Sequence, residues 1–196
     1  MTETRDVALL QRLITYPFST ADNLFSTNRV VRALAGARRK TSSETVDNYI
    51  DALEKAYVIS EAPQTVLQGK ELLSPLRKLY PVDQGLRNLV TRFSADNTGF
   101  QLENVIHNEL VRRGYSVEVG TLRTGEIDFV ARRADETVYV QVCETMVDPA
   151  TRERELSPLR AITDAFPKCV ITLDRYGLGT TSDGIKVLGA IDWLLD

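Results

Sequence analysis

The chain has 196 residues and a formal net charge of −3, and its 43% hydrophobic and 26% charged residues are ordinary for a folded globular protein, which excludes a strongly basic nucleic-acid-binding chain. Its only two cysteines, Cys143 and Cys169, exclude a disulfide scaffold and fit a reducing compartment. Because the first residues lack the apolar stretch of a signal peptide and no apolar run of about 18 residues follows, we expect a soluble, cytoplasmic protein without a membrane partner.

Residues 1–98 carry helical patterns along most of their length, and we predict that they form one domain. Apolar residues recur at helical spacing in Asp6–Tyr16, and Pro17 is expected to end that helix. A second helix is expected over Thr20–Leu34. The third begins at Thr41-Ser42-Ser43-Glu44, a string with the form of a capping box.

Short strand-like segments follow these three helices. Tyr57–Ser60 and Thr65–Leu67 flank a polar stretch, so they predict a small hairpin. Three helices followed by a hairpin are typical of a winged helix-turn-helix domain.

The string Lys78–Asn88 is interpreted as a structural linker between two domains. Tyr80 and Leu86 are expected to pack, and Asp83 is expected to cap the turn that Gly85 allows.

A basic stretch begins within the second predicted helix and ends before the third, and no acid occurs between Asp22 and Glu44. Its bases are Arg29, Arg32, Arg38, Arg39 and Lys40. Such a stretch can bind phosphates and position a winged helix on DNA. The expected recognition helix, however, exposes Asp47, Asp51 and Glu54, which repel a phosphate backbone. A DNA contact and a solvated or protein-binding loop therefore both stay open.

Residues 99–196 have mixed patterns and are predicted to form a second domain. A helix is expected from Gly99 to Arg113, where Gly114 ends it. Three strands, a helix and two further strands are then expected at Tyr115–Val119, Glu126–Ala131, Thr137–Cys143, Thr151–Phe166, Cys169–Leu173 and Ile185–Leu188. This order predicts an α/β domain.

Three polar side chains stand in apolar surroundings in this second domain. Glu103 lies beside the apolar stripe of the first helix, and Asp128 lies within an otherwise apolar strand. Gln141 lies on the next strand and is expected to point to the face opposite that of the valines on the same strand. A desolvated acid costs free energy unless something compensates it, and a divalent cation is one such group. Glu103, Asp128 and Gln141 could therefore bind Mg²⁺ or Mn²⁺, which would activate water and stabilise a leaving phosphate oxygen.

Ion pairing offers an alternative explanation of the same acids. Glu126 and Asp128 would then lie near solvent and meet Arg123, Arg132 or Arg133. Spacing alone favours ion pairs over a metal.

Ordered short motifs run through both halves of the chain. They are Thr45…Tyr49…Leu53-Glu54, Lys78–Arg87, Glu103-Asn104, Glu126–Val130, Tyr139–Val142, Arg154–Leu156 and Pro167-Lys168. This series resembles domain of unknown function 4143, the C-terminal module of many bacterial and archaeal AAA-type ATPases. The resemblance implies an α+β protein in which an N-terminal winged helix-turn-helix domain precedes a restriction-endonuclease-like, PD-(D/E)XK α/β domain.

The resemblance also implies roles for particular residues. Glu103, Asp128 and Gln141 occupy the acidic positions of active nucleases of that fold. The lysine position holds Cys143, which cannot act as a cation. Lys168, at a strand start, is a candidate replacement. We therefore expect a degenerate nuclease site.

Three functions stay open at this point: a regulatory or interaction module of an AAA-type ATPase, a metal-dependent nuclease acting on DNA or RNA, and a winged-helix DNA-binding protein. No Gly-x-x-x-x-Gly-Lys-Ser/Thr string occurs, so this chain is not expected to hydrolyse ATP. The expected partners are an N-terminal P-loop ATPase domain of the same gene product and an unidentified protein or nucleic acid. His107, the only histidine, is expected to be a hydrogen-bonded core residue.

Overall fold

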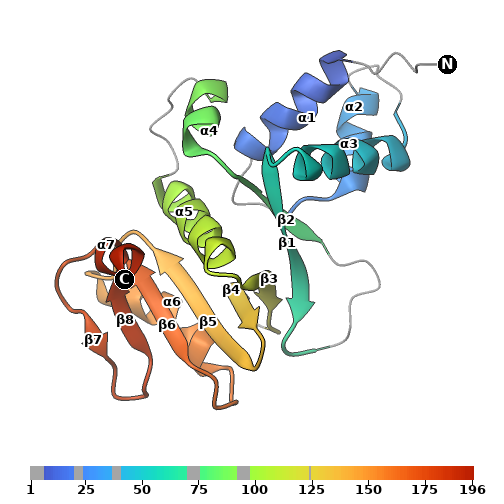
Figure 1. Ribbon diagram of the computed structural model, residues 1–196. Helices are drawn as coiled ribbons and strands as arrows, with labels where there is room; N and C mark the ends of the chain where they lie inside the picture. Colours follow the sequence, from blue (N-terminus) through green and yellow to red (C-terminus); the bar gives the residue numbers. More distant parts are fainter. Residues whose placement is uncertain (1–6, 20–23, 37–40, 70–75, 92–97, 124) are drawn as a thin grey trace. The chain divides into compact units, whose positions relative to one another are not determined.

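The computed structural model describes residues 7–19, 24–36, 41–69, 76–91, 98–123 and 125–196 (Figure 1). These residues form a mixed α+β fold with seven helices and a large mixed sheet. The chain forms two compact units. The N-terminal unit comprises Met1–Ala62 and Leu76–Ala95, and the C-terminal unit comprises Pro63–Pro75 and Asp96–Asp196. Within the described ranges, every helix is too short or too polar to span a lipid bilayer.

The N-terminal unit is built on three helices that share one apolar core. They are α1 (Val7–Ser19), α2 (Thr27–Gly36) and α3 (Ser43–Lys55). Leu13, Val46 and Ile50 are almost completely buried in this core. The predicted order of three helices is therefore confirmed.

The ends of these helices differ from the prediction. α1 continues past Pro17 to Ser19, because Phe18 is buried and its packing outweighs the backbone bond that proline cannot donate. α2 begins only at Thr27, because the Phe25 amide donates instead to the carbonyl of Arg77 (2.6 Å).

The N-cap of α3 is Ser42, so the predicted capping box starting at Thr41 is wrong by one residue. The Ser42 hydroxyl accepts a hydrogen bond from the amide of Thr45 (3.1 Å), which satisfies one of the free amides of the first turn.

The predicted hairpin is also wrong. β1 (Ile59–Val66) is one continuous strand, and its neighbour in the N-terminal unit is β2 (Arg77–Pro81). Between the two predicted arms the chain has neither glycine nor asparagine, the residues that a two-residue hairpin turn requires.

The linker interpretation of Lys78–Asn88 is wrong in its main point, because these residues belong largely to β2 and to α4 (Gln84–Val90). Asp83 is the N-cap of α4, where its carboxylate accepts from the amide of Leu86 (2.9 Å), as expected of a capping residue. Tyr80 is buried as predicted, but Leu86 is exposed.

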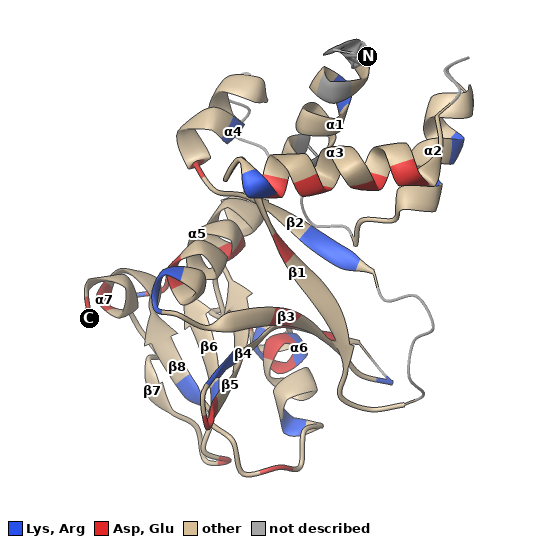
Figure 2. Ribbon diagram, turned by 45° about the vertical axis from the view of Figure 1, so that its right-hand side comes forward, with Lys and Arg blue, Asp and Glu red and all other residues tan. Residues whose placement is uncertain are grey.

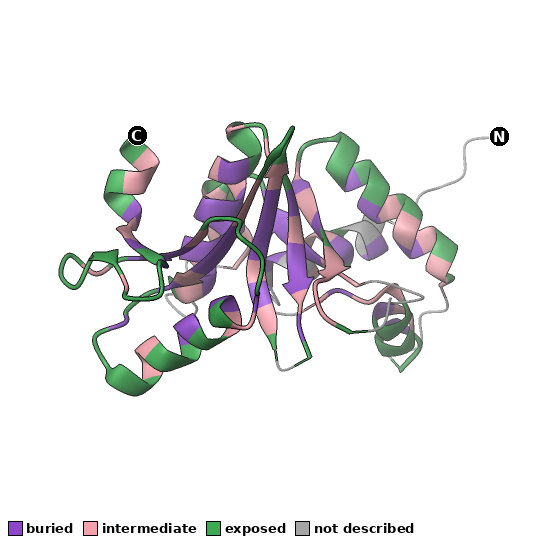
Figure 3. Ribbon diagram, turned by 90° about the horizontal axis from the view of Figure 1, so that it is seen from below, coloured by how far each residue is buried: buried purple, intermediate pink, exposed green. Residues whose placement is uncertain are grey.

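The C-terminal unit contains the rest of the sheet. Its strands are β3 (Ser116–Thr121), β4 (Glu126–Arg133), β5 (Glu136–Cys143), β6 (Lys168–Thr172), β7 (Gly179–Thr180) and β8 (Lys186–Gly189). The order, starting from the end of β1, is β1-β3-β4-β5-β6-β8-β7. Neighbours from β3 to β5 are antiparallel, whereas β5, β6 and β8 are parallel. Figure 3 shows that buried residues concentrate on the central strands.

Helices cover both faces of this sheet (Figure 1). They are α5 (Thr98–Arg112), α6 (Pro149–Arg160) and the short α7 (Ala190–Leu195). Leu156 and Leu159 of α6 pack with Tyr139 and Cys143 of β5 in one core cluster. The predicted order of helix, three strands, helix and strand is confirmed, although α6 ends at Arg160 and not at Phe166.

Candidate functional site

The candidate site lies where β4 and β5 separate. The last registered pair of these strands is Phe129 with Val140, and Asp128 lies just beyond it. There the Asp128 carboxylate accepts a hydrogen bond from the amide of Val142 (2.8 Å), and the Gln141 side-chain oxygen accepts from the amide of Asp128 (3.4 Å). At this point hydrogen bonds between side chain and backbone replace the backbone hydrogen bonds between the two strands. Each of the two side chains is oriented by a backbone amide of the opposite strand.

A second acid, Glu155 of α6, joins this group. The Gln141 side-chain amide donates to the Glu155 carboxylate (3.1 Å), and both side chains are at least nine-tenths buried. The other carboxylate oxygen of Glu155 accepts two hydrogen bonds from the Arg154 guanidinium (3.0 and 2.8 Å). Glu155 belongs to the Arg154–Leu156 motif, but it was not predicted to be a site residue. The pattern that could have indicated it is the helical spacing: Glu155 lies one turn before Leu159, which is buried, so both side chains face the sheet.

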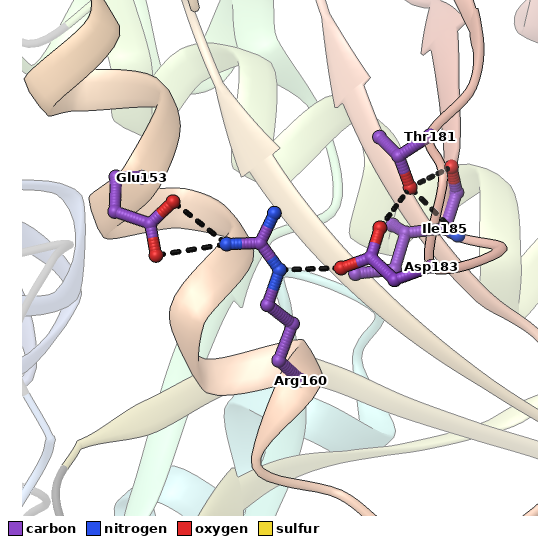
Figure 4. A network of polar contacts seen from close by, with 5 residues as sticks. All are labelled: Glu153, Arg160, Thr181, Asp183 and Ile185. Atoms are coloured by element: carbon purple, nitrogen blue, oxygen red, sulfur yellow. Dashed lines mark hydrogen bonds and ion pairs between the residues drawn. The ribbon is translucent and has the colours of Figure 1, made fainter.

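A network at the other end of α6 holds this helix in place (Figure 4). The Arg160 guanidinium pairs with Glu153 (2.7 Å) and also with Asp183, in the turn before β8. Thr181 closes that turn by accepting from the amide of Ile185 (3.0 Å). These contacts hold α6 on the face of the sheet that carries Gln141.

Cys143 completes the group at the end of β5. Burial, and then the negative charge of the neighbouring Glu155 carboxylate, raise the pKa of its thiol to about 12. The thiol is therefore neutral near pH 7 and contributes no charge at the position where the resemblance expects a lysine.

Lys168 lies at the start of β6, away from Cys143. It is paired in register with Tyr139, whereas Cys143 is paired with Thr172, about 13 Å further along the strand. Its ammonium group donates to the carbonyls of Asp164 (2.7 Å) and Phe166 (3.2 Å). The role of Lys168 in a site stays a prediction.

Glu103 lies on α5, a helix whose first turn approaches the residue after β5. Gly99, one turn earlier in α5, lies so close to Glu144 that a Cβ at this position would be 3.9 Å from the Glu144 side chain. Glu144 is the residue after Cys143. Glu103 is only 8% exposed. The structure thus brings Asp128 and Gln141 into contact, and a contact of Glu103 with them stays a prediction.

A metal site here would depend on Gln141. In the part of the chain that the structure describes, no three His, Cys, Asp or Glu side chains are grouped so that they could hold one ion. Glu103 and Asp128 would therefore need the Gln141 amide oxygen as a further ligand, and amide oxygens suit Mg²⁺ and Mn²⁺.

Two of the three arginines expected to neutralise these acids have other partners. Arg132 pairs with Glu118 on β3, and Arg133 pairs with Glu136 (3.1 Å) across the β4–β5 turn. The carboxylate of Asp128 is instead bound by a backbone amide.

The basic stretch of the N-terminal unit is described only in part. Arg29 and Arg32 are exposed on α2. Arg38, Arg39 and Lys40 lie outside the described residues.

The next helix, α3, carries bands of acidic residues (Figure 2). Asp47 pairs with Arg77 (2.9 Å), whereas Asp51 and Glu54 are exposed.

Comparisons with known proteins add a family match for the first half. Residues 1–97 match a domain of unknown function, DUF8612. The chain is also 37% identical over 191 residues to an uncharacterized protein of Haemophilus influenzae, a match that covers 97% of this chain and 47% of that relative. The chain thus spans about half the length of the relative that it matches. No solved structure matches the chain. These comparisons name neither domain 4143 nor an ATPase, so both stay proposals.

Proposed function

We propose that this chain is a regulatory and interaction module of a longer prokaryotic AAA-type ATPase, related to domain 4143, in which a winged helix-turn-helix domain precedes a restriction-endonuclease-like domain with a degenerate site. The observation that carries this proposal is the neutral Cys143 thiol at the position of the expected lysine, beside Asp128 and Gln141 side chains that brace two strands.

The chemistry of phosphodiester cleavage supports the loss of activity. A phosphoryl transition state accumulates negative charge, and an active site stabilises it with preorganised cations or donors. Cys143, with a pKa of about 12, supplies no positive charge, and the Lys168 ammonium is engaged with Asp164. Asp128 has a structural use. Its carboxylate accepts a hydrogen bond from the amide of Val142, at the point where β4 and β5 separate.

The N-terminal unit supports an interaction role over DNA reading. Three helices followed by two strands match the layout of a winged helix-turn-helix domain. On α3, which would be the recognition helix, Asp51 and Glu54 are exposed and would repel phosphates. A protein partner avoids that repulsion.

The length of the Haemophilus influenzae relative supports a larger parent protein. More than half of that relative lies outside the match, which is room for a further domain of ordinary size. A P-loop ATPase domain is the content that the resemblance to domain 4143 implies.

A cleavage assay tests the proposal. Single- and double-stranded DNA and RNA are incubated with the chain in Mg²⁺ or Mn²⁺, with Asp128→Ala as the matched variant and a chelator as the blank. We expect no cleavage by either protein above the blank. Metal-dependent cleavage that disappears in Asp128→Ala would refute the degenerate site and make the chain an enzyme.

The second candidate is that nuclease. The contact between Asp128 and Gln141 favours it, because these oxygens, with that of Glu103 as a third proposed ligand, could hold Mg²⁺ or Mn²⁺. A bound ion would supply the Lewis acid for phosphodiester cleavage. If the chain is a nuclease, these three side chains would only orient and hold the ion. Another positively charged group would still have to replace the missing lysine.

A further inference from the structure

The end of α3 carries a backbone conformation that its residue does not favour. Tyr57 has φ 56°, in the left-handed region. The turn is closed by hydrogen bonds from the amide of Tyr57 to the carbonyl of Glu54 (2.9 Å) and from the amide of Val58 to that of Leu53 (2.9 Å). Helices that end in this way usually place glycine or asparagine at the left-handed position, because a Cβ there meets the next carbonyl. A tyrosine therefore costs stability at this position.

The Tyr57 ring recovers little of that cost within the chain, because the residue is 82% exposed. The other non-glycine residue with positive φ, among those that the structure describes, is Ala134, in the tight turn between β4 and β5, where such angles are usual. A strained position that presents a large exposed ring indicates a function.

Further exposed apolar side chains lie on α4 and on the residue Val82 before it. The amide of Val82 donates to the carbonyl of Val58 (3.2 Å), which brings the start of α4 beside the end of α3. Val82 is 41% exposed, and Leu86 and Leu89, which share one side of α4 at a spacing of three, are 46% and 65% exposed. We call Tyr57, Val82, Leu86 and Leu89 the Tyr57 surface. A group of exposed apolar side chains marks a binding site more often than single ones do.

The charges beside the Tyr57 surface are mainly acidic. Asp51 and Glu54 are exposed on the last turns of α3, together with the single base Lys55, and Asp83 is exposed at the start of α4. Burial, and then the negative charges of Glu54 and Asp51, raise the pKa of Glu61, although Arg77 opposes this. Acids placed in this way repel nucleic acid and anionic lipid, and they attract cations.

We propose that the Tyr57 surface binds a basic amphipathic helix of a protein partner. Apolar side chains at positions i, i+3 or i+4 and i+7 of that helix would pack on Tyr57 and Leu89, and lysine or arginine at its flanks would face Asp51, Glu54 and Asp83. The inference deepens the proposed interaction module and rests on it, since it names the chemistry of the partner.

The test uses a fluorescein-labelled, 18-residue helical peptide of leucine and lysine, with leucine on one face. A scrambled peptide of the same composition has no apolar face, and a third peptide has glutamate in place of lysine. Fluorescence anisotropy with the full chain is expected to show binding of the first peptide, at least about tenfold weaker binding of the second, and none of the third.

Two variants connect binding to this surface. Tyr57→Gly is expected to weaken binding of the basic peptide about tenfold, while the midpoint of thermal unfolding stays constant or rises, because glycine adopts the left-handed conformation freely. Leu89→Ser, at an exposed position, is expected to weaken binding without changing the midpoint. Tyr176→Ser in the C-terminal unit is the matched control, because Tyr176 is 89% exposed, and it should bind as the unchanged chain does.

Charge reversal tests the acidic rim. The double variant Asp51→Lys, Glu54→Lys is expected to lose the basic peptide and to bind the glutamate peptide. Equal binding of the amphipathic and scrambled peptides, or unchanged binding by both Tyr57→Gly and Leu89→Ser, would overturn the proposal. Cleavage of nucleic acid would instead refute the degenerate site and leave the peptide result standing, so the two failures are distinguishable.

Discussion

His107 makes the stability of the C-terminal unit depend on pH. Its ring is fully buried on α5, with its centroid 5.8 Å from that of Phe129, and its Nδ1 lies 3.3 Å from the side-chain oxygen of Asn108. Burial lowers the pKa of His107 from 6.5 to about 4. The unfolded chain therefore binds a proton between these values that the folded chain does not bind. Stability is full above pH 6.5 and is lost as pH falls toward 4.

The size of the effect follows from those two values. At 1.36 kcal/mol for each pH unit between 6.5 and about 4, the free energy of unfolding falls by about 3 kcal/mol. By pH 5.5 the loss from this one group is about 1.4 kcal/mol. These figures are a large share of the stability of an ordinary domain.

Urea unfolding at pH 7.5, 6.5, 5.5 and 4.5 measures this loss. Trp193, the only tryptophan, reports on the C-terminal unit, since the Arg113 guanidinium lies 4.2 Å from the centre of its ring. His107→Gln removes the titrating group. Between pH 7.5 and 5.5 its free energy of unfolding should therefore fall by about 1.4 kcal/mol less than that of the unchanged chain. Carboxylates titrate in both proteins and cancel in the difference. Parallel curves for the two proteins would refute the reasoning.

Three further predictions follow from the site and the basic stretch. Asp128→Ala removes a charged acceptor and leaves the Val142 amide unpaired, so it should lower the free energy of unfolding by about 1–3 kcal/mol in the same Trp193 assay; no change would contradict the bracing role. Because the pKa of Cys143 is about 12, its alkylation by iodoacetamide at pH 8 should be slower by orders of magnitude in the folded chain than in urea, as quantified by mass spectrometry of the labelled peptide. Arg29→Ala with Arg32→Ala should leave the slope of log K against log salt for duplex DNA unchanged, and a smaller slope would favour the DNA-binding alternative.

Local sequence patterns predicted most elements of the fold because periodicity is a local property. The strand over Thr137–Cys143 has alternating side chains, and the helix from Gly99 has a regular apolar stripe, so both lie close to their predicted bounds. The hairpin failed because the neighbour of β1 comes from Arg77–Pro81, and no local signal names a distant partner.

The candidate site was predictable only in its parts. Asp128 and Gln141 were expected to lie on neighbouring strands, but their mutual contact depends on the register that pairs Phe129 with Val140. Glu155 comes from a helix that packs on the sheet, so its contact with Gln141 is a tertiary fact. The division of the chain into domains at residue 98 stays a prediction.

The path of the chain through its two units limits how it can be cut. β1 begins in the N-terminal unit, and its last residues, Gln64–Val66, lie parallel to Val119–Thr121 of β3. The chain then returns to the N-terminal unit at Leu76 before it enters the C-terminal unit again at Asp96. A fragment starting at residue 99 would lack that strand and leave the backbone of β3 as an open edge, which favours aggregation. Expression of the second half alone is therefore expected to require the β1 segment grafted back, for example through a circularly permuted design.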